Sequence, residues 1–184
     1  PVSPGGECAG EVAAMGTNVS GVSLGDRVIV RGGSSGYAEY TVATPAQLLP
    51  VPESLSLVEA STIGTIFFTA WGCLANSAKL QQGEVVLVQS CAGGVGSALV
   101  QVAKHLGATV IGTSSSQEKL DWAKRLGVDH GVNYVEQDFV EEVKKLTDGK
   151  GVSVIADGVG GDMFVRSLKC LQRGGRIVIY GVSG

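Results

Sequence analysis

The segment that decides the fold spans residues 85–107 and has the sequence VVLVQSCAGGVGSALVQVAKHLG. Its first four residues form an apolar run typical of a buried strand, and glycines separate this run from an apolar pattern with helical spacing. A strand, a glycine-rich turn and a helix are the parts of the G-x-G-x-x-G motif, whose turn binds a dinucleotide. Gly96 takes the third glycine position and Gly93 the second, whereas Cys91 occupies the first. Two glycines of three are a weak match, so the interpretation depends on the surrounding pattern.

The surrounding pattern alternates strands and helices as far as residue 181. Strands are predicted at 85–89, 109–113, 130–134, 152–157 and 176–181, and helices at 94–106, 116–126, 139–147 and 161–171. This alternation predicts a doubly wound parallel α/β sheet of the Rossmann type. The helix that begins near Gly94 would direct its positive end toward the phosphates of a dinucleotide.

The residues before Ser56 have a different sequence pattern. Four short β-like runs, CAGEVAAMG, DRVIVRG, YAEYTVA and QLLPVP, lie between glycines, serines and prolines, which indicates a small β-structure. From Ser56 onward the apolar spacing becomes helical. We expect Ser54 or Ser56 to cap this helix and Gly64 to mark a break in it.

The end of the second strand of the alternating region discriminates between the two nicotinamide dinucleotides. An acidic residue at this place would bind the adenosine ribose of NAD. Residues 110–119, VIGTSSSQEK, carry Thr113, Ser114 and Ser115 there instead. The hydroxyl groups and Lys119 suit a 2′-phosphate, so the sequence favours NADP(H). Alternatively, Lys119 is an ordinary solvated lysine on a helix and binds no cofactor.

Composition limits the other possible functions. The chain has 184 residues, 44% of them hydrophobic and 17% charged, with a net charge of −3, which is typical of a soluble globular protein. We expect no nucleic-acid partner, because no basic excess is present, and no membrane span, because no apolar run is long enough. Four cysteines without C-x-x-C spacing indicate reduced thiols in a cytoplasmic protein.

Motifs along the whole chain carry a family resemblance. They are PGGECAGEV, GDRVIV, GYAEYTV, VPESLSLVEASTI, FTAWGCL, LQQGEVVLV, AGGVGSALVQVAKHLGATVIGT, GVNY and DGVGGDMFVRSLKCLQRGGRIVIYG. The chain resembles the zinc-independent quinone oxidoreductases, the ζ-crystallin-like branch of the medium-chain dehydrogenase/reductase superfamily. In that family the phosphate turn typically reads A-x-G-G-V-G, so a small residue other than glycine at its start is normal.

The resemblance implies part of a GroES-like β-rich catalytic domain over residues 1–56 and a Rossmann NADP(H)-binding domain over 57–184, without its sixth strand. It implies NADPH as hydride donor, a quinone or conjugated enone as small-molecule substrate, a homodimer, and a cytoplasmic or mitochondrial location. Family members are longer, and we expect this chain to cover their central portion. A Tyr and an Asn near the nicotinamide would then lie outside it, which leaves the catalytic residues unassigned.

The resemblance also implies which residues surround NADPH. Thr69 would lie near the nicotinamide end of the cofactor. For Tyr134, packing in the core is the alternative. The residues that contact the pyrophosphate would be Ala92, Gly93, Gly94, Val95 and Gly96. The residues that surround the adenosine 2′-phosphate would be Gly112, Ser115, Lys119 and Tyr134. The residues that line the cofactor at the ends of later strands would be Asp157, Gly158, Gly160, Ile179, Tyr180, Gly181 and Val182.

A metal site is not expected. Zinc-dependent relatives carry a G-H-E motif, whereas this chain has Gly6, Glu7 and Cys8 at the matching place. His105, His130 and the scattered cysteines lack the spacing of a catalytic zinc site. Tyr37 and Tyr40 are candidate proton donors only because each carries a phenol. We expect both side chains to pack within a strand instead.

The sequence is compatible with three functions. The leading function is NADPH-dependent quinone reduction; a 2-alkenal or enoyl reductase of the same superfamily and a non-catalytic, crystallin-like NADPH-binding protein are the others. Residues 1–184 alone are expected to bind NADPH weakly and to show little activity. Cys91 is either a thiol whose oxidation or alkylation blocks NADPH, because of its place near a helix N-terminus, or a small core residue in place of alanine.

Overall fold

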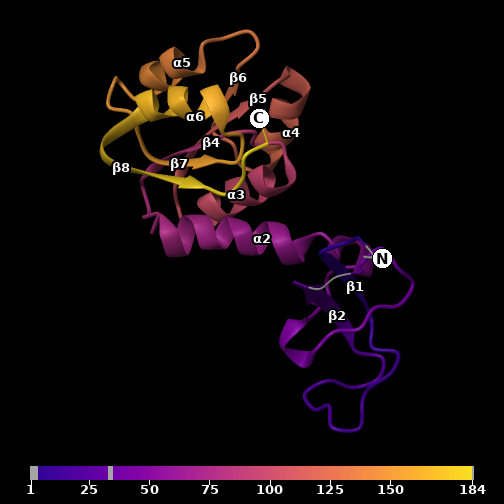
Figure 1. Ribbon diagram of the computed structural model, residues 1–184. Coiled ribbons are helices and arrows are strands. Elements are labelled where there is room, and N and C mark those ends of the chain that lie inside the picture. Colours follow the sequence, from indigo (N-terminus) through magenta and orange to yellow (C-terminus); the bar gives the residue numbers. More distant parts are fainter. Residues whose placement is uncertain (1–3, 33–34, 184) are drawn as a thin grey trace. The chain divides into compact units, whose positions relative to one another are not determined.

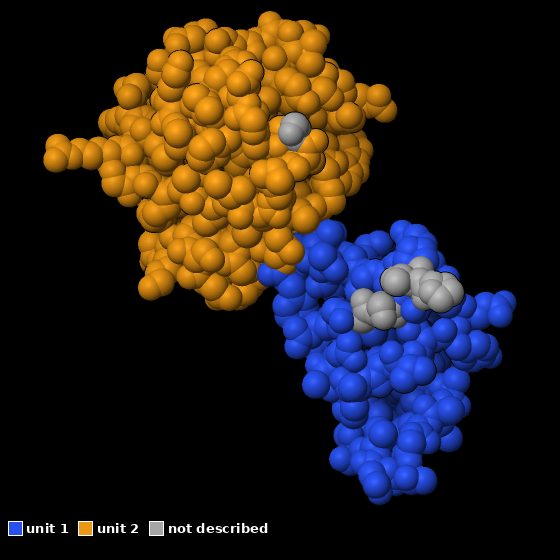
Figure 2. Space-filling view, viewed as in Figure 1, with its two compact units in different colours: residues 1–68 blue, residues 69–184 orange. Residues whose placement is uncertain are grey.

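The computed structural model describes residues 4–32 and 35–183. The chain divides into two compact units, Pro1–Phe68 and Thr69–Gly184, which Figure 2 distinguishes by colour. Each unit has its own sheet. Within the described residues, no helix has the length and apolarity needed to cross a membrane.

The first unit contains a small antiparallel sheet. Its strands are β1 (Glu7–Glu11), β2 (Arg27–Arg31) and β3 (Leu48–Pro50), in the order β1-β2-β3. A 3-10 helix, Pro45–Gln47, leads into β3. Ile29 of β2 pairs with Ala9 and Leu49 and packs in a core with Val51 and Ala60. Three of the four predicted β-like runs therefore form strands.

The fourth predicted run, YAEYTVA, is not a strand, and this expectation was wrong. Tyr37 and Tyr40 are 79% and 78% exposed, so they do not pack as expected. The segment begins with loop hydrogen bonds, in which the N–H groups of Gly36 and Tyr37 donate to the carbonyl oxygens of Gly5 and Pro4. Alternation of side chains predicts a strand only where a neighbouring strand completes the ladder, and among the described residues none pairs with this segment.

The helical stretch after Ser56 is interrupted, although not at Gly64. Helix α1 (Leu57–Ala60) is capped by Ser56, whose side chain accepts from the N–H of Glu59. Helix α2 (Ile63–Trp71) follows and continues into a π-helix, Gly72–Ser77. The break falls at Ser61 and Thr62, because their hydroxyl groups donate to the carbonyls of the last turn of α1. A Cβ on Gly64 would lie 2.8 Å from the Glu7 carboxylate, so close packing on β1 accounts for this glycine.

The second unit contains the predicted parallel sheet. The strands are β4 (Val85–Val88), β5 (Thr109–Ser114), β6 (His130–Asn133), β7 (Val152–Asp157) and β8 (Leu171–Ile179), in the order β6-β5-β4-β7-β8. The helices are α3 (Gly94–His105), α4 (Gln117–Leu126), α5 (Phe139–Leu146) and α6 (Gly161–Ser167). Figure 1 shows the sheet between α3 on one side and α5 and α6 on the other. The predicted Rossmann-type α/β fold is confirmed.

The end of the second unit differs from the prediction. Helix α6 ends at Ser167, a 3-10 turn covers Leu168–Cys170, and β8 begins at Leu171 instead of residue 176. The extra strand residues include Gly174 in a left-handed conformation, and the pairing of β7 with β8 shifts register between Val152 and Val154. Gly174 and Gly175, which precede the predicted start of the strand, thus lie inside β8 as an irregularity of the strand.

Candidate cofactor site

Strand β4 lies at the centre of the sheet, between β5 and β7. The chain leaves β4 toward one side of the sheet and crosses to the other side after β6, so the carboxyl end of β4 is the topological switch point. In open α/β sheets, ligands bind in the crevice outside this edge. The turn predicted to bind pyrophosphate starts there.

The turn between β4 and α3 is held by its own backbone. Ser90 adopts a left-handed conformation with φ of 52°, and its carbonyl oxygen accepts from the N–H of Gly93 at 2.9 Å. Gly93 is the N-cap of α3 and its carbonyl accepts from the N–H of Ser97. The first N–H groups of a helix have no partner inside it, and the first turn of α3 carries no acidic residue. This end of α3 is therefore suited to an anion.

Gly96 is required by close contact between the helix and the turn. A Cβ on Gly96 would overlap the carbonyl oxygen of Ser90 and lie 3.1 Å from the Cα of Cys91. Both contacts are with backbone, which cannot rotate away as a side chain can. The third glycine of the motif thus allows α3 to start directly against the turn.

Cys91 is a fully buried core residue of this turn. Its side chain is 0% exposed, and burial raises the pKa of the thiol to about 11. A Cβ on Gly112 of β5 would lie 2.7 Å from the Cys91 sulfur, so Gly112 makes room for it. Desolvation is the main cause of this raised pKa, and it outweighs the hydrogen bond from the backbone N–H of Cys91, which lowers the pKa. Burial favours the interpretation of Cys91 as a substitute for alanine.

Cys91 is therefore expected to resist alkylation in the folded protein. With a pKa of about 11, only about one thiol in a thousand is ionised at pH 8, and the reagent has no access to it. Mass spectrometry after iodoacetamide treatment should find the half-buried Cys8 and Cys73 labelled first. Cys170 is the matched control, since it is equally buried with a pKa of about 11. Labelling of Cys91 as fast as that of Cys8 in the native protein would contradict this account.

The end of β5 brings together two of the residues predicted at the 2′-phosphate. The Lys119 ammonium donates to the Ser115 hydroxyl at 3.2 Å, and Ser116 caps α4 by accepting from the N–H of Lys119. Gly112 lies deeper, beneath Cys91. Tyr134 donates its N–H to the carbonyl of Ser114 at 3.1 Å, while its side chain packs against the core around Phe139. Ser115 and Lys119 are the side chains available to an anion at this end.

The ends of β7 and β8 also meet. Asp157 is fully buried, and its Oδ1 accepts from the N–H groups of Val159 and Gly160 at 2.7 and 3.0 Å. Its carbonyl oxygen accepts from the N–H of Tyr180, and the Ser183 hydroxyl donates to the carbonyl of Gly158. The other Asp157 oxygen, Oδ2, is buried without a hydrogen-bond partner in the described structure.

Tyr180 closes the space beside Asp157. A Cβ on Gly158 would lie 2.6 Å from the Cζ of the Tyr180 ring, so this glycine makes room for the phenol. Burial, and then the charge of Asp157, raise the pKa of Tyr180 to about 12, so the phenol is neutral. Ile179 and Val182 on either side are exposed. Thr69, predicted near the nicotinamide, is a half-buried residue of α2 at the start of the second unit.

The edge of the sheet therefore fits a dinucleotide. The start of α3 offers backbone N–H groups, and it lies close to the turn because Gly96 has no Cβ to overlap the carbonyl oxygen of Ser90. The Ser115–Lys119 pair offers donors on the β5 side, and the Asp157–Gly160 loop follows β7 on the other side. Sequence reasoning missed Gln89, a buried polar residue that follows β4 directly. Its polar side chain at the end of an apolar strand was the only available signal.

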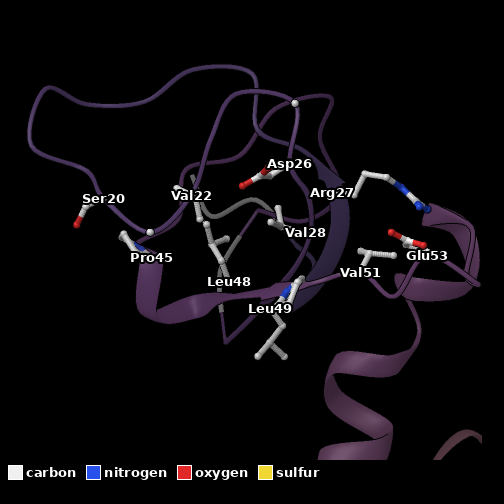
Figure 3. Close-up of a pocket in the computed structure, with 13 residues that line it drawn as sticks. Ser20, Val22, Asp26, Arg27, Val28, Pro45, Leu48, Leu49, Val51 and Glu53 are labelled. Atoms are coloured by element: carbon white, nitrogen blue, oxygen red, sulfur yellow. The ribbon is translucent and has the colours of Figure 1, made fainter.

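The first unit contains a hollow that is separate from the candidate cofactor site. It has a volume of about 630 Å³ and is lined by residues of the segments 20–28 and 45–53, drawn in Figure 3. None of the predicted cofactor residues lines it. Of its charged residues, Asp26 accepts from the N–H of Ser23 and Arg27 donates to the carbonyl of Leu55. Within the described ranges, no three His, Cys, Asp or Glu side chains gather as a metal site would require.

Comparisons with known proteins agree with this geometry. Residues 1–53 match the family described as "Alcohol dehydrogenase GroES-like domain", and residues 94–184 match "Zinc-binding dehydrogenase". "Quinone oxidoreductase-like protein 2" of Bos taurus is 42% identical over 100% of this chain and 53% of the bovine protein.

Several solved structures are similar over 100% of the chain, and two of them illustrate the likeness. Quinone oxidoreductase of Escherichia coli, complexed with NADPH, has a TM-score of 0.94 at 34% identity, and the match covers 57% of it. CurK enoyl reductase has a TM-score of 0.93 at 37% identity, and the match covers 55% of it. The chain thus spans about half the length of these proteins.

The second unit has the fold and the phosphate turn of a Rossmann-type dinucleotide-binding unit, and the chain also contains part of a GroES-like domain. The chain belongs to the quinone oxidoreductase branch of the medium-chain dehydrogenase/reductase superfamily.

Proposed function

We propose that the protein is an NADPH-dependent reductase of quinones or similarly conjugated acceptors, acting without a metal ion. The observation that carries the choice of cofactor is the end of β5. The Lys119 ammonium and Ser115 hydroxyl lie together there, and residues 109–117 contain no Asp or Glu. A carboxylate would repel a 2′-phosphate, whereas an ammonium and a hydroxyl bind one.

Each part of the site has a separate task in this proposal. The N–H groups at the start of α3 bind the pyrophosphate, and Ser115 with Lys119 binds the 2′-phosphate. The Asp157–Gly160 loop and the segment from Tyr180 to Val182 orient the nicotinamide end. Bound NADPH supplies a hydride, so the protein mainly has to bind, orient and exclude water. A homodimer in the cytoplasm or in mitochondria belongs to the same proposal.

A second candidate is an enoyl or 2-alkenal reductase. The observation in its favour is the likeness to CurK enoyl reductase, which is as strong as the likeness to quinone oxidoreductase. Both candidates transfer hydride to a conjugated system, and both use the same edge of the sheet for the cofactor. They differ in the acceptor only.

Steady-state consumption of NADPH by the full-length protein, with a quinone and with an enoyl thioester as acceptors, separates these candidates. We expect a higher kcat/KM for the quinone. A higher kcat/KM for the thioester would replace the first candidate by the second. Binding of NADPH without turnover of either acceptor would support a non-catalytic binding protein. Absence of NADPH binding would refute the proposal itself.

A further inference from the structure

Gln89 is the centre of a buried hydrogen-bond chain that joins three parts of the second unit. It follows β4 directly, its side chain is 0% exposed, and its backbone N–H donates to the carbonyl of Ala156 in β7. Its Oε1 accepts from the Thr113 hydroxyl of β5. Its Nε2 donates to the Ser167 hydroxyl, at the end of α6, at 2.8 Å. Thr113 and Ser167 are likewise fully buried.

The other hydrogen bonds of Ser167 and Thr113 determine which group donates and which accepts in each side-chain hydrogen bond of Gln89. The Ser167 hydroxyl donates to the carbonyl of Met163, so toward Gln89 it can only accept. The Thr113 hydroxyl oxygen accepts from the N–H of Ser90 at 3.3 Å, so its proton is directed to Gln89. A carboxamide meets both demands because it has a donor at one corner and an acceptor at the other.

The last link of the chain reaches the phosphate turn. Ser90 has a left-handed backbone, which is unfavourable for a residue other than glycine unless surrounding contacts hold it. The carbonyl of the same residue accepts from the N–H of Gly93 and lies against Gly96. The hydrogen bond from Ser90 to Thr113 is therefore placed to hold the turn in the conformation from which α3 starts.

We propose that Gln89 is a positioning residue for the cofactor site: through Thr113 it holds Ser90 and the phosphate turn, and through Ser167 it links this turn to α6. This inference rests on the proposed function, because it assumes that the turn binds pyrophosphate. Gln89 is buried beneath the turn and acts on the cofactor through Thr113 and Ser90.

The test measures Kd for two probes with purified variants of the protein. NADPH contacts the phosphate turn, whereas adenosine 2′-monophosphate carries the 2′-phosphate without a pyrophosphate. Gln89→Met and Thr113→Val each remove two of these buried hydrogen bonds. Each variant should weaken NADPH binding about tenfold and should leave the binding of adenosine 2′-monophosphate nearly unchanged. Thr113→Ser retains the hydroxyl and should keep wild-type affinity. The double variant Gln89→Met with Thr113→Val should lose no more affinity than either single variant.

A stability control separates positioning from general loosening. Val143→Ala removes a fully buried core side chain of α5, outside the hydrogen-bond chain, and should lower Tm without changing the Kd of NADPH. Wild-type affinity in both Gln89→Met and Thr113→Val would overturn the inference. If Gln89→Met does not fold, the comparison of Thr113→Val with Thr113→Ser decides alone. Failure of the wild-type protein to bind NADPH would instead refute the proposed function.

Discussion

Replacing Gly96 by alanine is expected to weaken NADPH binding about 100-fold or more and to lower the free energy of unfolding by about 2–3 kcal/mol. The added Cβ would overlap the carbonyl oxygen of Ser90 and lie 3.0 Å from its carbonyl carbon. The start of α3 must then move away from the turn, and its N–H groups move with it. Fluorescence titration with NADPH and denaturant unfolding measure the two effects.

The control for this variant is Gly72→Ala. Gly72 is also a helical glycine of the second unit, but a Cβ there would meet no atom within 4 Å. This variant should bind NADPH as the wild type does. Gly96→Ala with unchanged affinity would show that the approach of α3 to the turn is not needed for the cofactor.

Replacing Lys119 by alanine is expected to weaken NADPH about 10- to 150-fold, because a hydrogen bond to a charged group contributes about 1.5–3 kcal/mol. The Kd of NADH should change little, since NADH lacks the 2′-phosphate. The ammonium already lies 3.2 Å from the Ser115 hydroxyl, so the two groups can share one phosphate. Calorimetric titration of both cofactors with both proteins measures the difference.

Lys124→Ala is the control for a general loss of positive charge. Lys124 lies on the same helix, α4, and pairs with Asp121 at 3.5 Å. Its removal should affect NADPH and NADH equally and weakly. An equal loss of affinity for both cofactors in Lys119→Ala would identify destabilisation of α4 as the cause, and Lys119 would then be an ordinary solvated residue.

The sequence predicted the second unit well because its signals are local. Short apolar runs alternate with helices, and some of these helices carry their own end signals, as with Ser116 before α4 and Gly127 after it. Gly96 was assigned from motif spacing, and the contact with Ser90 gives the physical reason. The start of β8 was missed because Gly174 and Gly175 predict a turn when pairing with β7 is unknown.

The parts that the sequence did not predict depend on distant contacts. YAEYTVA has the alternation of a strand, yet no described strand pairs with it. The pKa of Cys91 follows from the packing of its sulfur against Gly112, which comes close only because β5 pairs in parallel with β4. The series of hydrogen bonds from Ser90 through Thr113 and Gln89 to Ser167 joins residues that are far apart in the sequence, and no local sequence pattern indicates it.

The site at the carboxyl ends of the parallel strands is proposed to bind NADPH in preference to NADH. Side-by-side titration of the wild-type protein with NADPH and NADH tests it most directly. The account predicts that NADPH binds at least about tenfold more tightly, from a charge-assisted contact of the 2′-phosphate with Lys119 and Ser115. Equal affinities, or tighter binding of NADH, would contradict it.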